Sequence, residues 1–414
     1  MRNFKRVTLA CYSANISMAI VGNLSPVLFL TFRSLYGISY SLLGLLVLIN
    51  FVTQLLVDLV FSFFSHKINM SKAVKITPIL TLTGLFIYSL SPFIFSGNVY
   101  AGLVIGTIVF SASGGFAEVL ISPVIAAIPS ENPEREMSKL HSIYAWGVVV
   151  VIILSTLFLL AFDAKYWWVL SLLFTLVPIF SACLFLGATL PELEKPERVS
   201  GMVSFLKSGW LWICILAIFL GGAAECTMAQ WSSSYSEQAL GIPKVWGDIF
   251  GVALFALALG FGRTLYSKYG KNIGRVLCLG AIGATACYFI AVISNIPIIG
   301  LIACAMTGFC VSMMWPGSLI VASERFPTAG VFIYAMMAAG GDLGASVAPQ
   351  LVGIITDGVS KSKLANELSA SLGLSCEQIG MKAGMLVGFI VSLIAIFVYL
   401  IIWRSNKKSK KDCC

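Results

Sequence analysis

The chain has 414 residues, of which 58% are hydrophobic and only 11% are charged, and its formal net charge is +9. Soluble domains carry about 25% charged residues, so this composition excludes a soluble protein and indicates one that crosses a membrane many times. The apolar runs last for about 20 residues, whereas the strands of a membrane barrel alternate over about ten, so a barrel is also excluded.

Twelve apolar segments of membrane-spanning length follow one another along the chain. They cover residues 7–31, 41–64, 73–95, 99–128, 141–162, 166–187, 210–232, 247–267, 274–293, 296–322, 329–356 and 383–403. We therefore expect an all-α integral membrane protein with twelve transmembrane helices. A polar segment divides them, which predicts a six-helix bundle over 1–189, a linker over 190–208, a second six-helix bundle over 209–403 and a basic tail over 404–414.

Most of the 27 lysine and arginine residues fall on one side of the membrane if the N-terminus is cytoplasmic. Because cytoplasmic loops carry the excess of positive charge, both termini are predicted to be cytoplasmic, in a cell membrane. This asymmetry explains the net charge without a nucleic-acid partner, and the tail can contact anionic lipid headgroups. The eleven cysteines show no paired or metal-ligand spacing, so neither a disulfide framework nor a metal site is expected.

The second expected span carries Asn50, Gln54 and Asp58, which are spaced four residues apart and therefore share one helical face. Asp58 lies near the cytoplasmic end of the span. We interpret it as a hydrogen-bonding partner for loop cations or helix ends.

The fourth expected span holds a carboxylate, Glu118, within an apolar run, followed by Ser122 and Pro123. An acid at membrane depth costs about 2.5 to 3.5 kcal/mol, so it marks a functional site. A dry bundle disfavours its charged form, and opening to water on one side releases the proton. We predict that Glu118 carries a coupling proton; the alternative is a neutral acid that ties spans four and five together.

The seventh and eleventh expected spans hold two further deep acids, Glu225 and Asp342. Gly221 and Gly222 precede Glu225, and they either favour a bend there or only allow close packing between helices. Asp342 either handles a proton or ligand or acts as a structural tie. Before the twelfth span we expect a short surface helix, and then an N-cap formed by Ser375 and Gln378.

Polar and aromatic side chains recur along the expected transport path. The candidate solute-binding residues are Asn15, Asn23, Glu118, His141, Tyr144, Glu225, Gln230, Trp231, Trp315 and Gln350. Aromatic rings can stack on a pyranose face, and amides can bind hydroxyl groups. No lysine or arginine is expected deep in a span, which argues against phosphate esters, nitrate or dicarboxylates. A neutral, hydroxyl-rich solute is therefore predicted.

The spacing of Glu118, Ser122 and Pro123, followed by His141-x-x-Tyr144-x-x-Gly, resembles the fucose permease-like sugar:proton symporters of the major facilitator superfamily. The likeness extends to Glu225 with Trp231 and to the segments SMMWPGSLIVASERFP and GGDLGASVAPQ, residues 312–327 and 340–350.

The resemblance implies two bundles with 3+3 inverted repeats, alternating access and a sugar site between the bundles. It implies that Glu118 matches the family's acid for proton coupling and sugar contact, and that His141 and Tyr144 match polar cavity positions. The better-studied sugar symporters have an aspartate in span one, where this chain has Asn15 and Asn23.

We therefore expect a monomeric secondary transporter, without a cofactor, that moves a hexose or deoxyhexose and couples to protons through Glu118 and Asp342. The alternative is a proton-driven exporter of amphipathic or cationic compounds, with Glu118, Glu225 and Asp342 receiving the cations. A lipid translocator would need a lateral opening, and a passive receptor would have no use for acids in three spans. The sequence has no phosphate-binding loop and no nucleophile paired with a base, so an enzyme is not expected.

Overall fold

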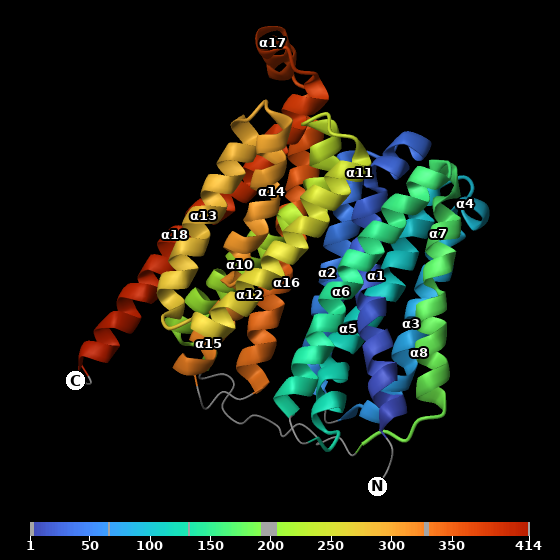
Figure 1. The fold of residues 1–414 in the computed structure, drawn as a ribbon, viewed down its shortest axis with the longest axis vertical. Helices are drawn as coiled ribbons and strands as arrows, with labels where there is room; N and C mark the ends of the chain where they lie inside the picture. The colour runs from blue at the N-terminus through green and yellow to red at the C-terminus, as the bar shows by residue number, and fades with distance from the viewer. Residues whose placement is uncertain (1–3, 65–66, 131–132, 192–204, 327–330, 413–414) are drawn as a thin grey trace. The chain divides into compact units, whose positions relative to one another are not determined.

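The computed structural model describes residues 4–64, 67–130, 133–191, 205–326 and 331–412, and within these ranges the chain is almost entirely helical and contains no strand (Figure 1). It forms two compact units. One comprises Met1–Ile38 and Ile49–Arg198, and the other comprises Ser39–Leu48 and Val199–Cys414. Most of the predicted linker, 192–204, lies outside the described residues.

The first unit contains most of the helices of the N-terminal half. They are α1 (Lys5–Tyr36), α2 (Tyr40–Phe64), α3 (Met70–Ser89), α4 (Ser91–Ile94), α5 (Val99–Ala126), α6 (Pro133–Ala161), the short 3-10 turn η2 (Ala164–Tyr166), α7 (Trp167–Phe174) and α8 (Leu176–Leu186). The first turns of α2 are grouped with the second unit.

The second unit contains the C-terminal helices. They are α10 (Gly209–Gln238), α11 (Lys244–Trp246), the π-helical segment η3 (Gly247–Ala253), α12 (Leu254–Tyr269), α13 (Ile273–Ile293), α14 (Pro297–Val311), α15 (Met314–Arg325), α16 (Val331–Ser360), α17 (Lys363–Leu372) and α18 (Cys376–Asp412).

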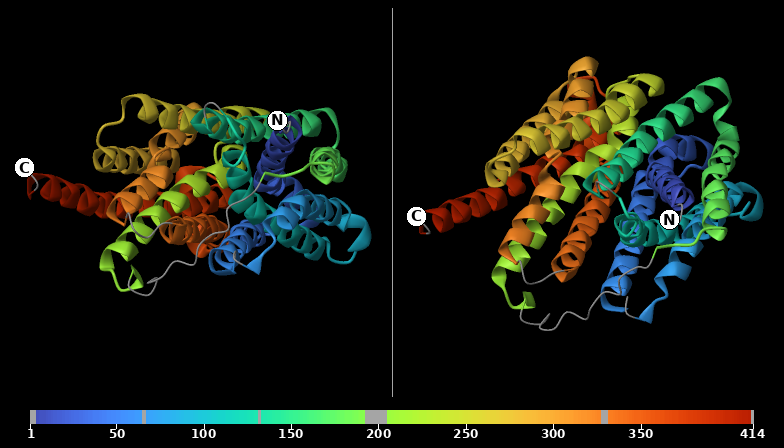
Figure 2. Two further views of the ribbon diagram at one scale, coloured as in Figure 1. Left: turned by 90° about the horizontal axis from the view of Figure 1, so that it is seen from below. Right: turned by 60° about the horizontal axis from the view of Figure 1, so that its bottom comes forward.

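Eleven helical segments of the described chain are long and apolar enough to cross a membrane. Helix α16 occupies the one remaining predicted position, so the twelve-helix prediction is confirmed. The predicted basic tail begins as a continuation of the twelfth span, because α18 runs on to Asp412. Figure 2 shows the end of α18 extending past the other helices of its unit.

The N-cap predicted before the twelfth span is confirmed, and the helix that it begins, α18, starts at Cys376, seven residues before the predicted span. The Ser375 amide donates to Gln378 Oε1 at 2.8 Å, and the Gln378 amide donates to Ser375 Oγ at 3.1 Å. This reciprocal pair satisfies two backbone donors that the first turn of α18 leaves free. The short helix expected before it is α17.

Lys382, which directly precedes the predicted twelfth span, is a buried residue of α18, only 8% exposed. Its ammonium donates to the carbonyl of Val292 at 3.1 Å, to the carbonyl of Ser294 at 2.5 Å and to Asn295 Oδ1 at 3.2 Å. The charge therefore lies at the C-terminal end of α13, where unpaired carbonyls and the helix dipole favour a cation.

Helices α10 and α16 pack closely through glycines. A Cβ added to Gly222 would lie 2.4 Å from the carbonyl oxygen of Gly341, and one added to Gly344 would lie 2.0 Å from that of Phe219. Helix α10 continues without a break past Gly221 and Gly222. Of the two interpretations of this glycine pair, the structure therefore supports close helix packing.

We expect Gly344→Ala to destabilise the second unit, because the new methyl group would overlap the backbone of α10 and force the helices apart. Overpacking of this kind costs about 1 to 3 kcal/mol. The measurement is the thermal unfolding of the purified protein in detergent.

Gly358→Ala is the matched control, since it lies on the same helix and a Cβ there would meet no atom within 4 Å. Equal melting temperatures for the two variants would contradict the importance of the α10–α16 contact.

Candidate functional site

The polar face of α2 lies against α5 in the first unit. Ser111 Oγ donates to Asn50 Oδ1 at 2.6 Å, and a Cβ added to Gly114 would lie 3.3 Å from Gln54 Oε1. A Cβ added to Gly115 would lie 2.8 Å from Val57 Cβ, so the glycines let α5 approach α2 closely. Polar groups on successive turns of α2 therefore lie opposite α5 along this contact.

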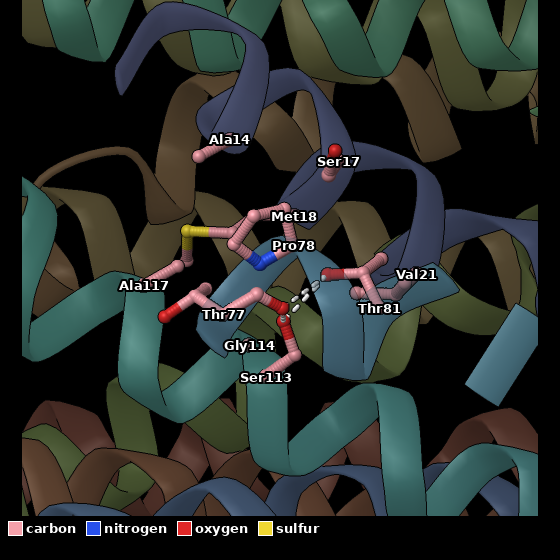
Figure 3. A pocket seen from close by; sticks show the side chains of 10 residues that line it. All are labelled: Ala14, Ser17, Met18, Val21, Thr77, Pro78, Thr81, Ser113, Gly114 and Ala117. Atoms are coloured by element: carbon pink, nitrogen blue, oxygen red, sulfur yellow. Dashed lines mark hydrogen bonds between the residues drawn. The ribbon is translucent and has the colours of Figure 1, made fainter. Parts of the chain in front are cut away.

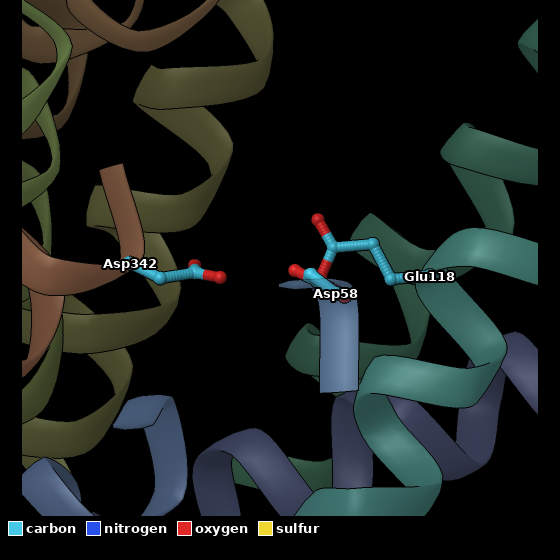
Figure 4. Close-up of side chains that lie close together, drawn as sticks. All are labelled: Asp58, Glu118 and Asp342. Atoms are coloured by element: carbon cyan, nitrogen blue, oxygen red, sulfur yellow. The ribbon is translucent and has the colours of Figure 1, made fainter. Parts of the chain in front are cut away.

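One step further along the same contact, Asp58 meets Glu118. An oxygen of each carboxylate lies within 4.8 Å of the other, and the two side chains point toward each other (Figure 4). Asp58 is 4% exposed, whereas Glu118 is exposed. Two carboxylates at this separation repel each other when both are charged.

The interpretation of Asp58 as a hydrogen-bonding partner for loop cations or helix ends remains a prediction. The structure adds that Asp58 lies beside the acid of the fourth span, which the sequence analysis did not anticipate. The signal was present: Asn50 and Asp58 are eight residues apart on α2, Ser111 and Glu118 are seven apart on α5, and both spacings correspond to about two helical turns.

The other predicted site residues of the first unit include two asparagines that are hydrogen-bonded to backbone carbonyls and an exposed tyrosine. Asn15 is buried and its amide donates to the carbonyl of Leu140 at 2.9 Å, which joins α1 to α6. The Asn23 amide donates to the carbonyl of Ala19 at 2.9 Å within α1. Tyr144 is 38% exposed on α6, and the side chain of His141 lies outside the described residues.

A narrow gap lies between α1, α3 and α5 (Figure 3). It is lined partly by hydroxyl groups that bind one another: Thr81 Oγ1 lies 2.5 Å from Ser113 Oγ, and Ser113 Oγ donates to the carbonyl of Thr77 at 2.8 Å. Since these groups are satisfied within the bundle, we assign the gap to helix packing and not to solute binding.

In the second unit the tenth span is broken. Helix α14 ends at Val311 and α15 begins at Met314. Pro316 explains the break, because its ring has no N–H to donate to the carbonyl four residues earlier and collides with that carbonyl. The carbonyl concerned belongs to Ser312. It accepts a hydrogen bond from Arg263 Nε of α12 at 3.0 Å, which replaces the missing donor.

Arg263 also pairs with the acid of the seventh span. Its Nη2 lies 3.2 Å from Glu225 Oε1 and 3.1 Å from Glu225 Oε2, and the two side chains are 42% and 17% exposed. Arg263 lies three residues before the end of its span, Lys244–Tyr266, where the sequence analysis expected no deep cation. Its long side chain carries the charge from the second half of α12 to the break in the tenth span, opposite the middle of α10.

Trp315 and Asp342 lie close to this ion pair. The Trp315 ring packs on two glycines, since a Cβ added to Gly222 would lie 2.9 Å from it and one added to Gly341 would lie 2.5 Å from it. Glu225 follows Gly222 by one helical turn, and Asp342 follows Gly341 directly.

The remaining candidates of the second unit are buried. Trp231 is fully buried, and its indole N–H donates to the carbonyl of Pro349 at 2.9 Å, so it is not available to stack on a solute. Gln230 is 7% exposed. Gln350 is half-buried, and its Oε1 has no hydrogen-bond partner among the described residues. We therefore assign Trp231 to packing and keep Gln350 as a candidate.

The family model of the Major Facilitator Superfamily matches residues 10–349. The chain belongs to this superfamily. It is therefore a multi-pass membrane transporter with the two-bundle, twelve-helix fold, as the sequence predicted. No curated protein matches the sequence.

Solved structures of the superfamily cover nearly the whole chain. A D-xylose-proton symporter matches with a TM-score of 0.72 and 13% identity, over 95% of this chain and 97% of that chain. A bacterial homologue of the human lysosomal transporter Spinster, inward-facing and occupied, matches with a TM-score of 0.70 and 15% identity, over 98% of both chains. The E. coli fucose:proton symporter matches with a TM-score of 0.55 and 15% identity, over 95% and 99%. At these identities the likeness concerns the fold.

Proposed function

We propose that the protein moves a small neutral polar solute, with a hexose or deoxyhexose as the leading candidate, by alternating access coupled to proton movement through Glu118. The observation that carries the proposal is the pair formed by Glu118 and Asp58, whose carboxylate oxygens lie within 4.8 Å. The pair takes up a proton when it is shielded from water and releases it when Glu118 meets water on one side.

One proton is sufficient for useful accumulation. Moving one charge through 100 mV contributes about 2.3 kcal/mol. That energy corresponds to roughly forty-fold accumulation of a neutral solute, since about 1.4 kcal/mol is tenfold. Asp342, buried in the second unit, is the candidate for a further proton-handling group.

The charge balance of the second unit supports a neutral solute. The positive charge of Arg263 is neutralised by the Glu225 carboxylate, with which it forms an ion pair. The sequence argument against anionic solutes therefore still applies, because the charge of Arg263 is already paired.

The same ion pair weakens the exporter hypothesis. That hypothesis used three deep acids to receive cations, and one of them, Glu225, is bound to Arg263. We propose in addition that the protein works as a monomer in the cell membrane. From the distribution of its lysine and arginine residues, we propose that both termini are cytoplasmic.

Uptake of radiolabelled fucose, glucose and galactose into proteoliposomes, with and without an inside-alkaline pH gradient, tests the proposal. We expect gradient-driven accumulation of one of the three sugars, abolished by a protonophore. Uptake no greater than in protein-free liposomes, for all three sugars and with the protein correctly folded, would refute the sugar assignment.

A further inference from the structure

We infer that Arg263 and Glu225 together recognise two neighbouring hydroxyl groups of the solute, so that the transported molecule carries a vicinal diol. The inference rests on the proposed function, because it concerns a neutral, hydroxyl-rich solute. Arg263 was not among the candidate solute-binding residues of the sequence analysis.

The hydrogen bonds of Arg263 leave one edge of its guanidinium group available. This group has five N–H donors in a planar fork. Nε binds the Ser312 carbonyl and Nη2 binds the Glu225 carboxylate, while Nη1 donates to no acceptor in the described part of the chain. The side chain is 42% exposed. Two of the three nitrogens therefore fix the group in place, and the third is free to bind a ligand.

Glu225 supplies the complementary acceptor. Each of its oxygens accepts one hydrogen bond from Nη2 and retains further lone-pair capacity. The ion pair thus offers a charged donor and a charged acceptor side by side. Neighbouring hydroxyl groups match this arrangement, because one oxygen can accept from Nη1 while the adjacent hydroxyl donates to the carboxylate.

The surroundings favour a diol over a carboxylate or phosphate group. An anionic group would be attracted by Arg263 but repelled by Glu225, whose carboxylate is bound to the same guanidinium group. The Arg263 side chain is 42% exposed, so the described residues leave its open edge uncovered.

An aromatic ring lies beside the ion pair. Trp315 is half-buried and packs on Gly222, one helical turn before Glu225. Aromatic rings bind the apolar faces of cyclic molecules. A tryptophan also has a polar N–H, so it suits a position between apolar and hydrated surroundings. A ring-shaped solute with a diol on its edge could therefore contact Trp315 and the ion pair together.

The test compares solutes that differ by one hydroxyl group. Uptake of radiolabelled D-galactose, D-glucose or L-fucose, whichever the native protein transports, is competed with its monodeoxy analogues. Uridine and 2′-deoxyuridine form a second arm, which shows whether the diol belongs to a hexose or to a ribonucleoside. We expect removal of either of two adjacent hydroxyl groups to weaken competition about tenfold or more, the usual weight of hydrogen bonds to charged groups.

The variant Glu225→Gln then assigns the contact. We expect the same deoxy analogues to compete more nearly as well as the parent sugar, because glutamine offers a neutral amide oxygen in place of the charged acceptor, and hydrogen bonds to neutral groups are weaker. Glu237→Gln is the matched control, since it changes an acid of the same helix and should keep full discrimination. Size-exclusion chromatography shows that each variant is folded, and the comparison of analogues on the native protein needs no variant.

The outcomes separate the two proposals. Sugar uptake with no pair of adjacent hydroxyl groups being required, or with discrimination unchanged in Glu225→Gln, would overturn the diol site and leave the sugar transporter standing. Uptake of radiolabelled uridine that unlabelled uridine competes and 2′-deoxyuridine does not, without sugar uptake, would support the diol site and overturn the sugar assignment. No interaction with either class would overturn both.

Discussion

Glu118→Gln is expected to abolish uphill accumulation of the solute while leaving exchange of solute across the membrane intact. Glutamine keeps the shape and hydrogen-bonding capacity of the side chain but cannot carry a proton. The pH gradient then loses the group that the proposal makes the proton carrier, and accumulation falls from the roughly forty-fold limit at 100 mV to equilibration. The measurement pairs gradient-driven uptake with counterflow in the same proteoliposomes.

Asp163→Asn is the control for this prediction, because it replaces an exposed acid of the same unit outside the spans. Asp58→Asn tests the pair itself. If Asp58 shares the proton with Glu118, its replacement should shift the pH dependence of uptake without preventing binding. Undiminished uphill uptake by Glu118→Gln would exclude Glu118 as the proton carrier.

Arg263→Met is expected to destabilise the protein by about 2 kcal/mol. This figure lies between the values for surface ion pairs and for buried ones, since the arginine is 42% exposed and the glutamate 17%. The variant leaves Glu225 charged at membrane depth without its cation and leaves the Ser312 carbonyl without its donor. A fall of several degrees in the apparent melting temperature in detergent would report both losses.

A second variant separates the two contributions. Arg263→Met combined with Glu225→Gln removes the uncompensated charge but not the orphaned carbonyl, so it should recover part of the lost stability. Lys268→Met, on the same helix, is the control for loss of a positive charge. If the double variant is no more stable than Arg263→Met, the ion pair contributes nothing and only the hydrogen bond to Ser312 matters.

The helices could be predicted from the sequence because the local amino-acid composition identifies a membrane span. A run of about 20 apolar residues must form a helix in lipid, whatever its neighbours. The same holds for local features such as the Ser375–Gln378 cap, which depends on residues three positions apart. These predictions needed no knowledge of which helix packs on which.

The site could be predicted only in part, because its geometry depends on contacts between helices. Glu118 was identified because an acid within an apolar membrane span has a free-energy cost that marks a functional site. Asp58 was not recognised as its partner, since the register of α2 on α5 is set by Gly114 and Gly115. Trp231 was expected to face a solute, but the direction of its side chain depends on α16, where Pro349 accepts its indole N–H.

Arg263 shows a second limit of sequence reasoning. An arginine near the end of an apolar segment is usually assigned to the interface, because its long side chain can reach water. Here the side chain turns the other way, toward a carbonyl that Pro316 has deprived of its donor. The proline was visible in the sequence, and asking which donor serves the carbonyl four residues before it would have suggested a search for this arginine.

The break in the tenth span also constrains the order in which the protein can be assembled. A free carbonyl in lipid is costly, and its substitute donor must come from elsewhere in the chain. Both partners of the ion pair precede the break in the sequence, and synthesis proceeds from the N-terminus. Glu225 and Arg263 can thus combine as a neutral pair during insertion, before Ser312 leaves the ribosome. The donor for the Ser312 carbonyl, Arg263, is then already in the bilayer when the broken helix is inserted.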